Sequence, residues 1–94
     1  MYLYNISVIV DNDRHEQLID WIKNNWLNEL PEDTKFLKLL DSPHEGQTYC
    51  VQLIFHNPSD IPAFQQSKVI LLQNHITENH HEKAFIFDST MKYL

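Results

Sequence analysis

The chain has 94 residues, of which 43% are hydrophobic and 21% charged, a composition typical of a globular protein. This length fits one domain, so we expect residues 1–94 to fold as a unit. The net charge is −6, and the seven lysines and arginines are scattered singly, which argues against nucleic acid or an anionic membrane as a partner. No apolar run approaches the ~20 residues of a membrane span.

Cys50 is the only cysteine and Gly46 the only glycine. One cysteine cannot form an internal disulfide, and residues 1–13 lack the basic region and cleavage site of a signal peptide. We therefore expect a cytoplasmic protein. Walker and Rossmann loops need several glycines where the backbone approaches phosphate, so neither kind of nucleotide site is present.

Residues 2–10 are rich in β-branched and aromatic side chains, which predicts a strand. Successive side chains of a strand point to opposite faces, so one set should meet the helices and the other should not. The first set is Tyr4, Ile6, Val8 and Val10, and the second is Asn5, Ser7 and Ile9.

Residues 13–30 predict the first helix, because apolar side chains recur along one stripe and Pro31 follows as a stop. Asp13 and Glu16 have the spacing of a capping box at its start. Trp21 lies off the stripe. The stripe itself consists of His15, Leu18, Ile19, Ile22, Trp26 and Leu30.

Residues 34–42 and 48–56 flank a turn marked by Pro43 and Gly46, and they predict an antiparallel hairpin. The leucines of 34–42 also fit a short helix, but the neighbouring turn favours a strand. In the second strand, Tyr49, Val51, Leu53 and Phe55 should face the helices, and Thr48, Cys50, Gln52, Ile54 and His56 should face the other way.

Residues 59–81 predict the second helix, with Ser59 as its N-cap and Pro62 in the first turn, where a missing N–H is tolerated. Its expected buried stripe is Ile61, Phe64, Leu71, Leu72 and Ile76. Residues 83–94 predict the last strand. The element order βαββαβ defines an α+β, ferredoxin-like plait, a four-stranded antiparallel sheet with both helices on one face.

Four stretches carry a resemblance to a known family: "YNISVIVD", "DWI", "GQTYCVQLIF" and the aromatic last strand. They resemble a small bacterial family, domain-of-unknown-function family 4286, most specifically in the first strand and at Thr48, Tyr49, Val51 and Gln52. Members of that family look like the dimeric α/β-barrel superfamily, so the resemblance implies that fold. The superfamily contains cofactor-free oxygenases, haem-binding enzymes, isomerases and ligand-sensing domains, so the resemblance implies no particular activity.

The stretch "NHITENHHEK" contains His75, His80 and His81, three of the six histidines. On a helix His75 and His80 would project ~140° apart, and His81 a further ~100°. A helical zinc pair instead needs ligands four residues apart. We therefore expect the solvated end of a helix and no metal. The alternative is a site completed by a second chain, by His44 or by His56.

The sheet face away from the helices should be mixed, with apolar Ile9 and Ile54 among polar residues. In a monomeric plait this face is exposed to water. In a dimeric barrel it contacts the same face of a second copy and lines an enclosed space. The polar residues are Asn5, Ser7, Gln52 and His56. We favour their bonding to one another and to water across a dimer interface; the alternative is that they orient a small polar ligand.

Four side chains bear on whether the protein has a reactive or ligand-binding pocket. Cys50 and His56 share a strand and a face, but six extended residues separate them by ~20 Å, which excludes a nucleophilic pair. Tyr49 and His56 are the titratable groups that an enzyme would use. Trp21, off the apolar stripe, suits the wall of an interface or pocket, where tryptophan is enriched.

The sequence therefore predicts a homodimer joined through the uncovered sheet face, with a non-catalytic role in small-ligand binding or assembly and without a cofactor. The candidate ligand-binding residues are Asn5, Ser7, Trp21, Tyr49, Gln52 and His56. The alternative, an oxygenase- or isomerase-like enzyme that works without a cofactor in a pocket of the barrel, rests on the resemblance alone.

Overall fold

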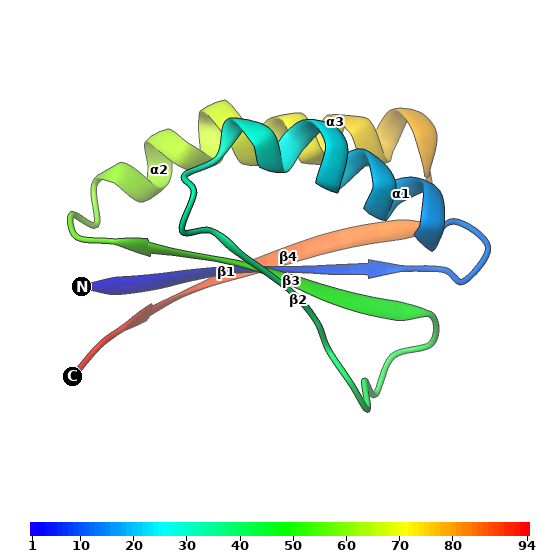
Figure 1. The fold of residues 1–94 in the computed structure, drawn as a ribbon, viewed down its shortest axis with the longest axis horizontal. Coiled ribbons are helices and arrows are strands. Elements are labelled where there is room, and N and C mark those ends of the chain that lie inside the picture. The colour runs from blue at the N-terminus through cyan, green and yellow to red at the C-terminus, as the bar shows by residue number, and fades with distance from the viewer.

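The computed structural model describes all of residues 1–94 as a four-stranded antiparallel sheet with two helical segments on one face (Figure 1). The strands are β1 (Tyr2–Val10), β2 (Lys35–Lys38), β3 (Gln47–Phe55) and β4 (Ala84–Lys92), in the order β2-β3-β1-β4 across the sheet. The expected βαββαβ plait is confirmed.

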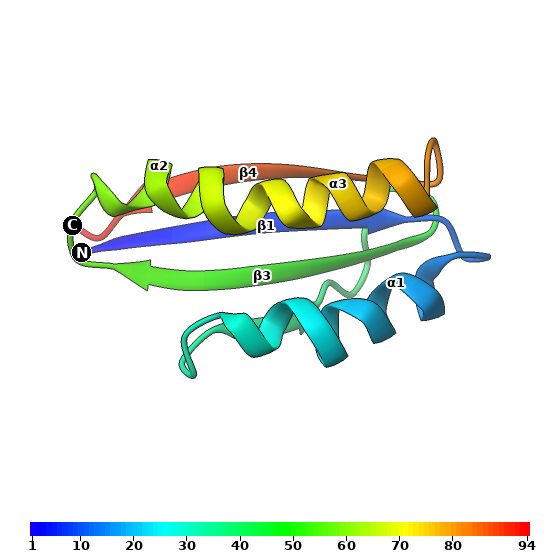
Figure 2. The same cartoon turned by 90° about the horizontal axis from the view of Figure 1, so that it is seen from above.

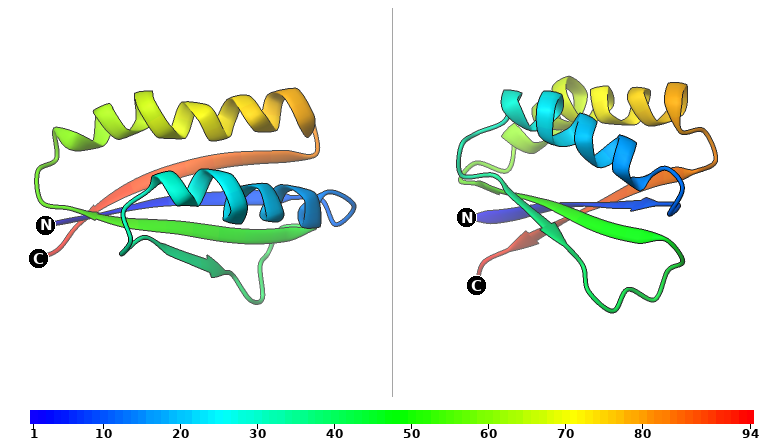
Figure 3. Two further views of the ribbon diagram at one scale, coloured as in Figure 1. Left: turned by 45° about the horizontal axis from the view of Figure 1, so that its top comes forward. Right: turned by 45° about the vertical axis from the view of Figure 1, so that its right-hand side comes forward.

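Each helical segment contains a π-helical stretch. The first consists of α1 (His15–Trp21), the π-helix η1 (Ile22–Trp26) and the 3-10 turn η2 (Leu27–Glu29). The second consists of α2 (Asp60–Phe64), the π-helix η3 (Gln65–Val69) and α3 (Ile70–Asn79). From above, the first segment lies on the β3 side of the sheet and the second runs along the β4 side (Figures 2 and 3).

Strand β1 is central and pairs antiparallel with both neighbours, so its register fixes the two faces of the sheet. Ile6 lies opposite Val51 on β3 and Asp88 on β4, whereas Ser7 lies opposite Cys50 and Phe87. Because side chains alternate along each strand, Ile6 and its partners face the helices, and Ser7 and its partners face away.

The core lies between the sheet and the helices, as the two periodicities predict. The four inward residues of β1 are fully buried, and the apolar stripe of the first helical segment is buried apart from partly exposed His15. These residues are Tyr4, Ile6, Val8, Val10, Leu18, Ile19, Ile22, Trp26 and Leu30.

The capping box predicted for the first helix does not form. The helix begins at His15, and Arg14 occupies the N-cap position without a side-chain hydrogen bond. The carboxylate of Asp13 lies instead 3.6 Å from the Nζ atom of Lys83, in the turn before β4. The spacing of Asp13 and Glu16 predicted a cap, but the carboxylate of Asp13 lies beside Lys83, which is distant in the sequence.

The second helical segment follows its predicted course with two corrections. Ser59 precedes the helix as expected, but its hydroxyl donates to Asn57 Oδ1 at 2.8 Å and not to the helix. Leu71 is 43% exposed and does not join the buried stripe, whereas Leu72 is fully buried. Neighbouring helical residues project ~100° apart, so only one of the two leucines can face the sheet.

The hairpin is shorter than predicted on its first arm. Strand β2 ends at Lys38, and residues 39–46 form a loop that projects to the sheet face opposite the helices (Figure 1). The hydroxyls of Ser42 and Thr48, 2.9 Å apart, join this loop to β3. Gly46 has φ +82°, and a Cβ atom there would collide with the carbonyl oxygen of Val10, so glycine is required.

Candidate functional site

The sheet face away from the helices, called the open face below, is apolar at its margins and almost without charge. Phe85 and Phe87 on β4 are about half exposed, at 51% and 50%. Lys35 is the only charged residue on this face. The full set is Leu3, Asn5, Ser7, Ile9, Lys35, Leu37, Thr48, Cys50, Gln52, Ile54, Phe85, Phe87, Ser89 and Met91.

A polar row crosses the middle of the open face. Gln52 on β3 donates from Nε2 to Oδ1 of Asn5, its partner across the strands, at 3.1 Å. Asn5 in turn donates from Nδ2 to the hydroxyl of Ser7 at 3.1 Å. Three of the predicted site residues therefore come together, and they bond to one another within one chain.

The other three predicted residues lie elsewhere. Tyr49 faces the helices, where its hydroxyl lies 3.4 Å from Nδ1 of His15 and burial raises its pKa. Trp21 stacks on His75 of α3. His56 follows the end of β3, four residues beyond Gln52, which is about 13 Å along an extended chain.

The histidine cluster differs from its expected form. Helix α3 ends at Asn79, and the chain then turns, so that the ring of His80 lies 5.5 Å from that of His75. The His80 carbonyl accepts hydrogen bonds from the N–H groups of Lys83 and Ala84, and this turn holds the residue over the core with only 4% exposure. The expectation of a solvated helix end is therefore wrong for His80.

His81, by contrast, is exposed, and its Nε2 lies 3.8 Å from a carboxylate oxygen of Glu82. No three His, Cys, Asp or Glu side chains lie close enough to share a metal ion. Burial lowers the pKa of both His75 and His80. The charge of His80 lowers the pKa of His75 further, Glu78 opposes that shift, and Arg14 lowers the pKa of His80.

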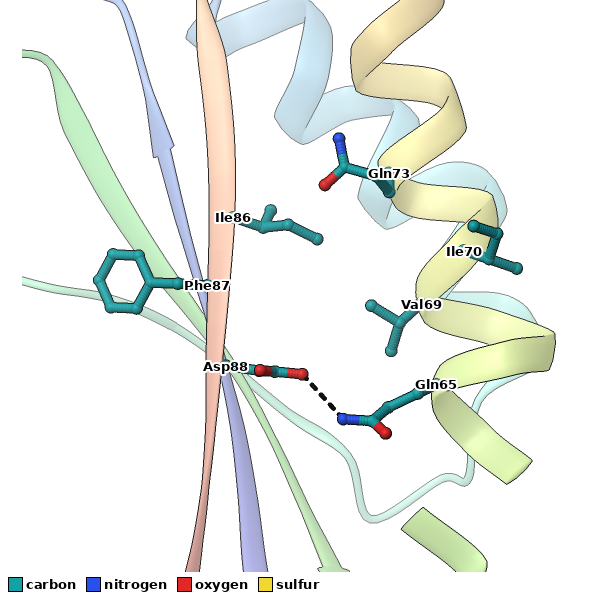
Figure 4. Close-up of a pocket in the computed structure, with 7 residues that line it drawn as sticks. All are labelled: Gln65, Val69, Ile70, Gln73, Ile86, Phe87 and Asp88. Carbon is teal, nitrogen blue, oxygen red and sulfur yellow. Dashed lines mark hydrogen bonds between the residues drawn. The ribbon is translucent and has the colours of Figure 1, made fainter. Parts of the chain in front are cut away.

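A cleft of about 300 Å3 opens between the second helical segment and the helix-facing side of β4 (Figure 4). Ile86 and Asp88 point into it from the strand, and Gln65, Val69 and Gln73 point toward them from the helix. Phe87 and Ile70 complete the lining, although the ring of Phe87 points to the open face. All seven residues come from one chain.

Asp88 is the only charged residue in this cleft. Its Oδ2 accepts hydrogen bonds from the hydroxyl of Tyr4 and, at 3.1 Å, from Nε2 of Gln65. The Tyr4 ring is held in the core by edge-on contacts with Phe55 and Phe64. Burial, followed by the bond to Asp88, raises the pKa of Tyr4 well above its usual range, so Tyr4 stays protonated and acts as a donor.

The cleft is not evident from the sequence. The only indication of it is the alternation along β4, which places Asp88 on the same face of the strand as Ala84 and Ile86. Asp88 itself is exposed, on an edge strand of the sheet.

The topology places the chain in the ferredoxin-like fold class, as a plait of two helical segments on a four-stranded antiparallel sheet. The chain belongs to the family described as domain of unknown function 4286, whose model matches residues 1–94. The expected resemblance to this family is thus confirmed.

Two solved structures are similar in fold. A crystal structure of an ethyl tert-butyl ether degradation (EthD) family protein from Bacillus halodurans C-125 superposes with a TM-score of 0.61 and 11% identity, and 100% of each chain is covered. A putative PII-like signaling protein from Thermus thermophilus gives a TM-score of 0.45 and 9% identity over 97% of this chain and 89% of that one.

No curated protein matches the sequence significantly. None of the helices has the length and apolar character needed to cross a membrane.

Proposed function

We propose that the protein is a cytoplasmic homodimer in which two copies bring their open faces together, and that its role is small-ligand binding or assembly without catalysis. The observation that carries this proposal is the nearly uncharged open face, with Phe85 and Phe87 half exposed on a chain whose net charge is −6. Interface cores are depleted of charged residues and enriched in aromatic ones, and such a patch on a soluble chain marks a binding surface.

The energetics of pairing are favourable. A standard interface buries ~1,600 Å2 in total. At ~25 cal/mol per Å2 its apolar share contributes roughly 20 kcal/mol. Association costs about 4–15 kcal/mol, so a surplus is left. The helices cover only the other face, which makes a second copy of the same sheet a fitting cover for this one.

The polar row would lie within the shared space of such a dimer. Buried polar groups need hydrogen-bond partners, and Asn5, Ser7 and Gln52 already supply partners to one another. Their remaining donors and acceptors are available to the other copy or to a small polar ligand. Cys50, a free and half-buried thiol on the same face, fits a reducing compartment such as the cytoplasm.

Light scattering coupled to size exclusion, at micromolar concentration, tests the dimer. The parent chain should elute with twice the chain mass. Ile54→Lys should elute as a monomer, because it places two ammonium groups in a poorly hydrated interface. The matched control is Leu71→Lys, since Leu71 is as exposed as Ile54 but lies on the helical layer. His44 lies in the loop that projects on the open-face side, so it is a weaker control.

Two outcomes contradict the proposal. One is a parent chain that elutes as a monomer, and the other is an Ile54→Lys variant that remains dimeric. Native mass spectrometry of the protein from its own host then addresses the ligand. A small molecule that is retained by the dimer and lost by Ile54→Lys would support binding in the shared space.

A further inference from the structure

The cleft between the second helical segment and β4 contains one carboxylate oxygen that accepts no hydrogen bond from the chain. Asp88 Oδ2 receives two hydrogen bonds, but Oδ1 accepts none from the chain. Gln65 donates one N–H of its amide to Asp88, and Gln73 donates one of its own to Thr77 Oγ1 at 3.2 Å. Asp88 Oδ1 therefore remains a free carboxylate acceptor in the cleft.

The carboxylate of Asp88 has no cationic partner. No Lys, Arg or His nitrogen lies within 4.0 Å of it, whereas the lysine nearest the end of α3, Lys83, pairs with Asp11 and Asp13. Asp88 is exposed, but its two hydrogen bonds orient the carboxylate, because Tyr4 is buried and Gln65 belongs to the helix wall. An oriented, unneutralised carboxylate beside aliphatic Val69 and Ile86 favours a ligand that brings both the positive charge and the apolar body.

We propose that this cleft binds a small primary amine in its protonated form, with the ammonium group on Asp88 and a short aliphatic chain against Val69 and Ile86. An ammonium group carries a positive charge and only donors, which suits the free carboxylate oxygen of Asp88. The volume of about 300 Å3 is at the lower limit for ligand pockets, so the ligand is small. An anion would be repelled by the carboxylate and by the chain's net charge.

The polar groups of this site lie apart from the proposed dimer interface, and only Phe87 borders both, with its ring on the open face. The cleft is on the helix-facing side of the sheet and is formed by one chain, whereas the polar row is on the open face. Amine binding and dimerisation can therefore succeed or fail independently. Ile54→Lys should retain amine binding even if it becomes a monomer.

Methyl-detected NMR titration with three probes of equal size tests the proposal. Butylammonium should shift the methyl signals of Val69 and Ile86 saturably, with a dissociation constant on the order of millimolar. Butanol and butyrate should bind about 10- to 100-fold more weakly, because a charge-assisted hydrogen bond is missing.

Two isosteric variants locate the charge. Asp88→Asn should weaken butylammonium binding by about 10- to 100-fold, since an amide still accepts from Tyr4 but carries no charge. Asp20→Asn removes one charge from an exposed position on α1 and should leave binding within about twofold, a difference too small for a lost hydrogen bond. Both variants change the net charge equally, so only position distinguishes them.

Three results would overturn the proposal: similar affinities for the three probes, unchanged amine binding by Asp88→Asn, or no saturable shift of the Val69 and Ile86 signals. The methyl spectra themselves show whether each variant is folded.

Discussion

The indole ring of Trp21 lies face to face with the imidazole ring of His75, with ring centroids 3.7 Å apart and an angle of 5° between the planes. Trp21 belongs to α1 and His75 to α3, so the stack joins the two helical segments. This contact explains why Trp21 lies off the apolar stripe of its own helix: it faces the neighbouring helix and not the sheet.

His80 is adjacent to this stack and is buried without a partner for Nδ1. We predict that His80→Leu leaves the urea midpoint at pH 7 unchanged or raises it, because replacing an unsatisfied buried polar group by an apolar one is neutral or stabilising. Urea unfolding at one fixed protein concentration measures the change, since a dimer's stability depends on concentration.

The same variant should weaken the acid sensitivity of the fold. The pKa values of His75 and His80 are lowered in the folded chain, mainly by burial, so the unfolded chain takes up protons first as the pH falls. The stability contributed by the neutral rings is therefore full above about pH 6.5 and is lost as the pH falls below that value.

Histidine titrates between about pH 7 and pH 5. The urea midpoint should decrease less over this range for His80→Leu than for the parent chain. His81→Leu is the matched control, since it makes the same substitution at the next residue, which is exposed. It should retain the parent's acid sensitivity. Equal losses for the two variants would show that the burial of His80 does not govern the acid response.

The hydrogen bond from Tyr4 to Asp88 predicts how the stability of the fold changes at alkaline pH. Tyr4→Phe should cost about 1–2 kcal/mol at pH 7, because Asp88 loses one donor but keeps Gln65 and water. The pKa of Tyr4 is raised in the folded chain, so its contribution is present below about pH 10 and is lost as the pH rises above that value.

The measurement is again urea unfolding, at pH 7 and at about pH 10.5, just above the tyrosine pKa. The parent chain should lose more stability between these values than Tyr4→Phe does. Tyr93→Phe, which alters an exposed tyrosine near the end of the chain, serves as the control and should behave like the parent. A Tyr4→Phe variant as alkali-sensitive as the parent would contradict the assigned role of the Tyr4 hydroxyl.

Much of the fold was predictable because it depends on periodicity. Alternation along β1 separated Ile6 from Ser7, and each lies on its expected face of the sheet. The 3.6-residue period likewise identified the buried side of the first helix, centred on Ile22. These patterns are local, and burial of one face is sufficient to produce them.

The cleft was not predictable in this way. Tyr4 and Asp88 are 84 residues apart in the sequence, and Gln65 is 23 residues from Asp88. No local pattern pairs them; only the placement of β4 beside β1 does so. The burial of His80 is also a tertiary effect, because the turn into β4, and not the helix, sets its position.

The phase of the first helix permits a direct test. Ile22 is fully buried between the helix and the sheet, and Lys23 is exposed at the next position. Ile22→Asp places an unpaired carboxylate in the core, which costs several kcal/mol. A small domain has only roughly 5–10 kcal/mol of stability, so this variant should be largely unfolded. Lys23→Asp changes a solvated side chain and should shift stability by less than about 0.5 kcal/mol.

Urea unfolding followed by circular dichroism at one fixed protein concentration distinguishes the two variants. Ile22→Asp should lack a cooperative transition or show a midpoint far below that of the parent, whereas Lys23→Asp should nearly coincide with it. The two substitutions introduce the same side chain one residue apart, so helix propensity is matched at the substituted position. Equal midpoints would mean that Ile22 does not face the sheet, and the packing of α1 and η1 over β1 and β3 would have to be wrong.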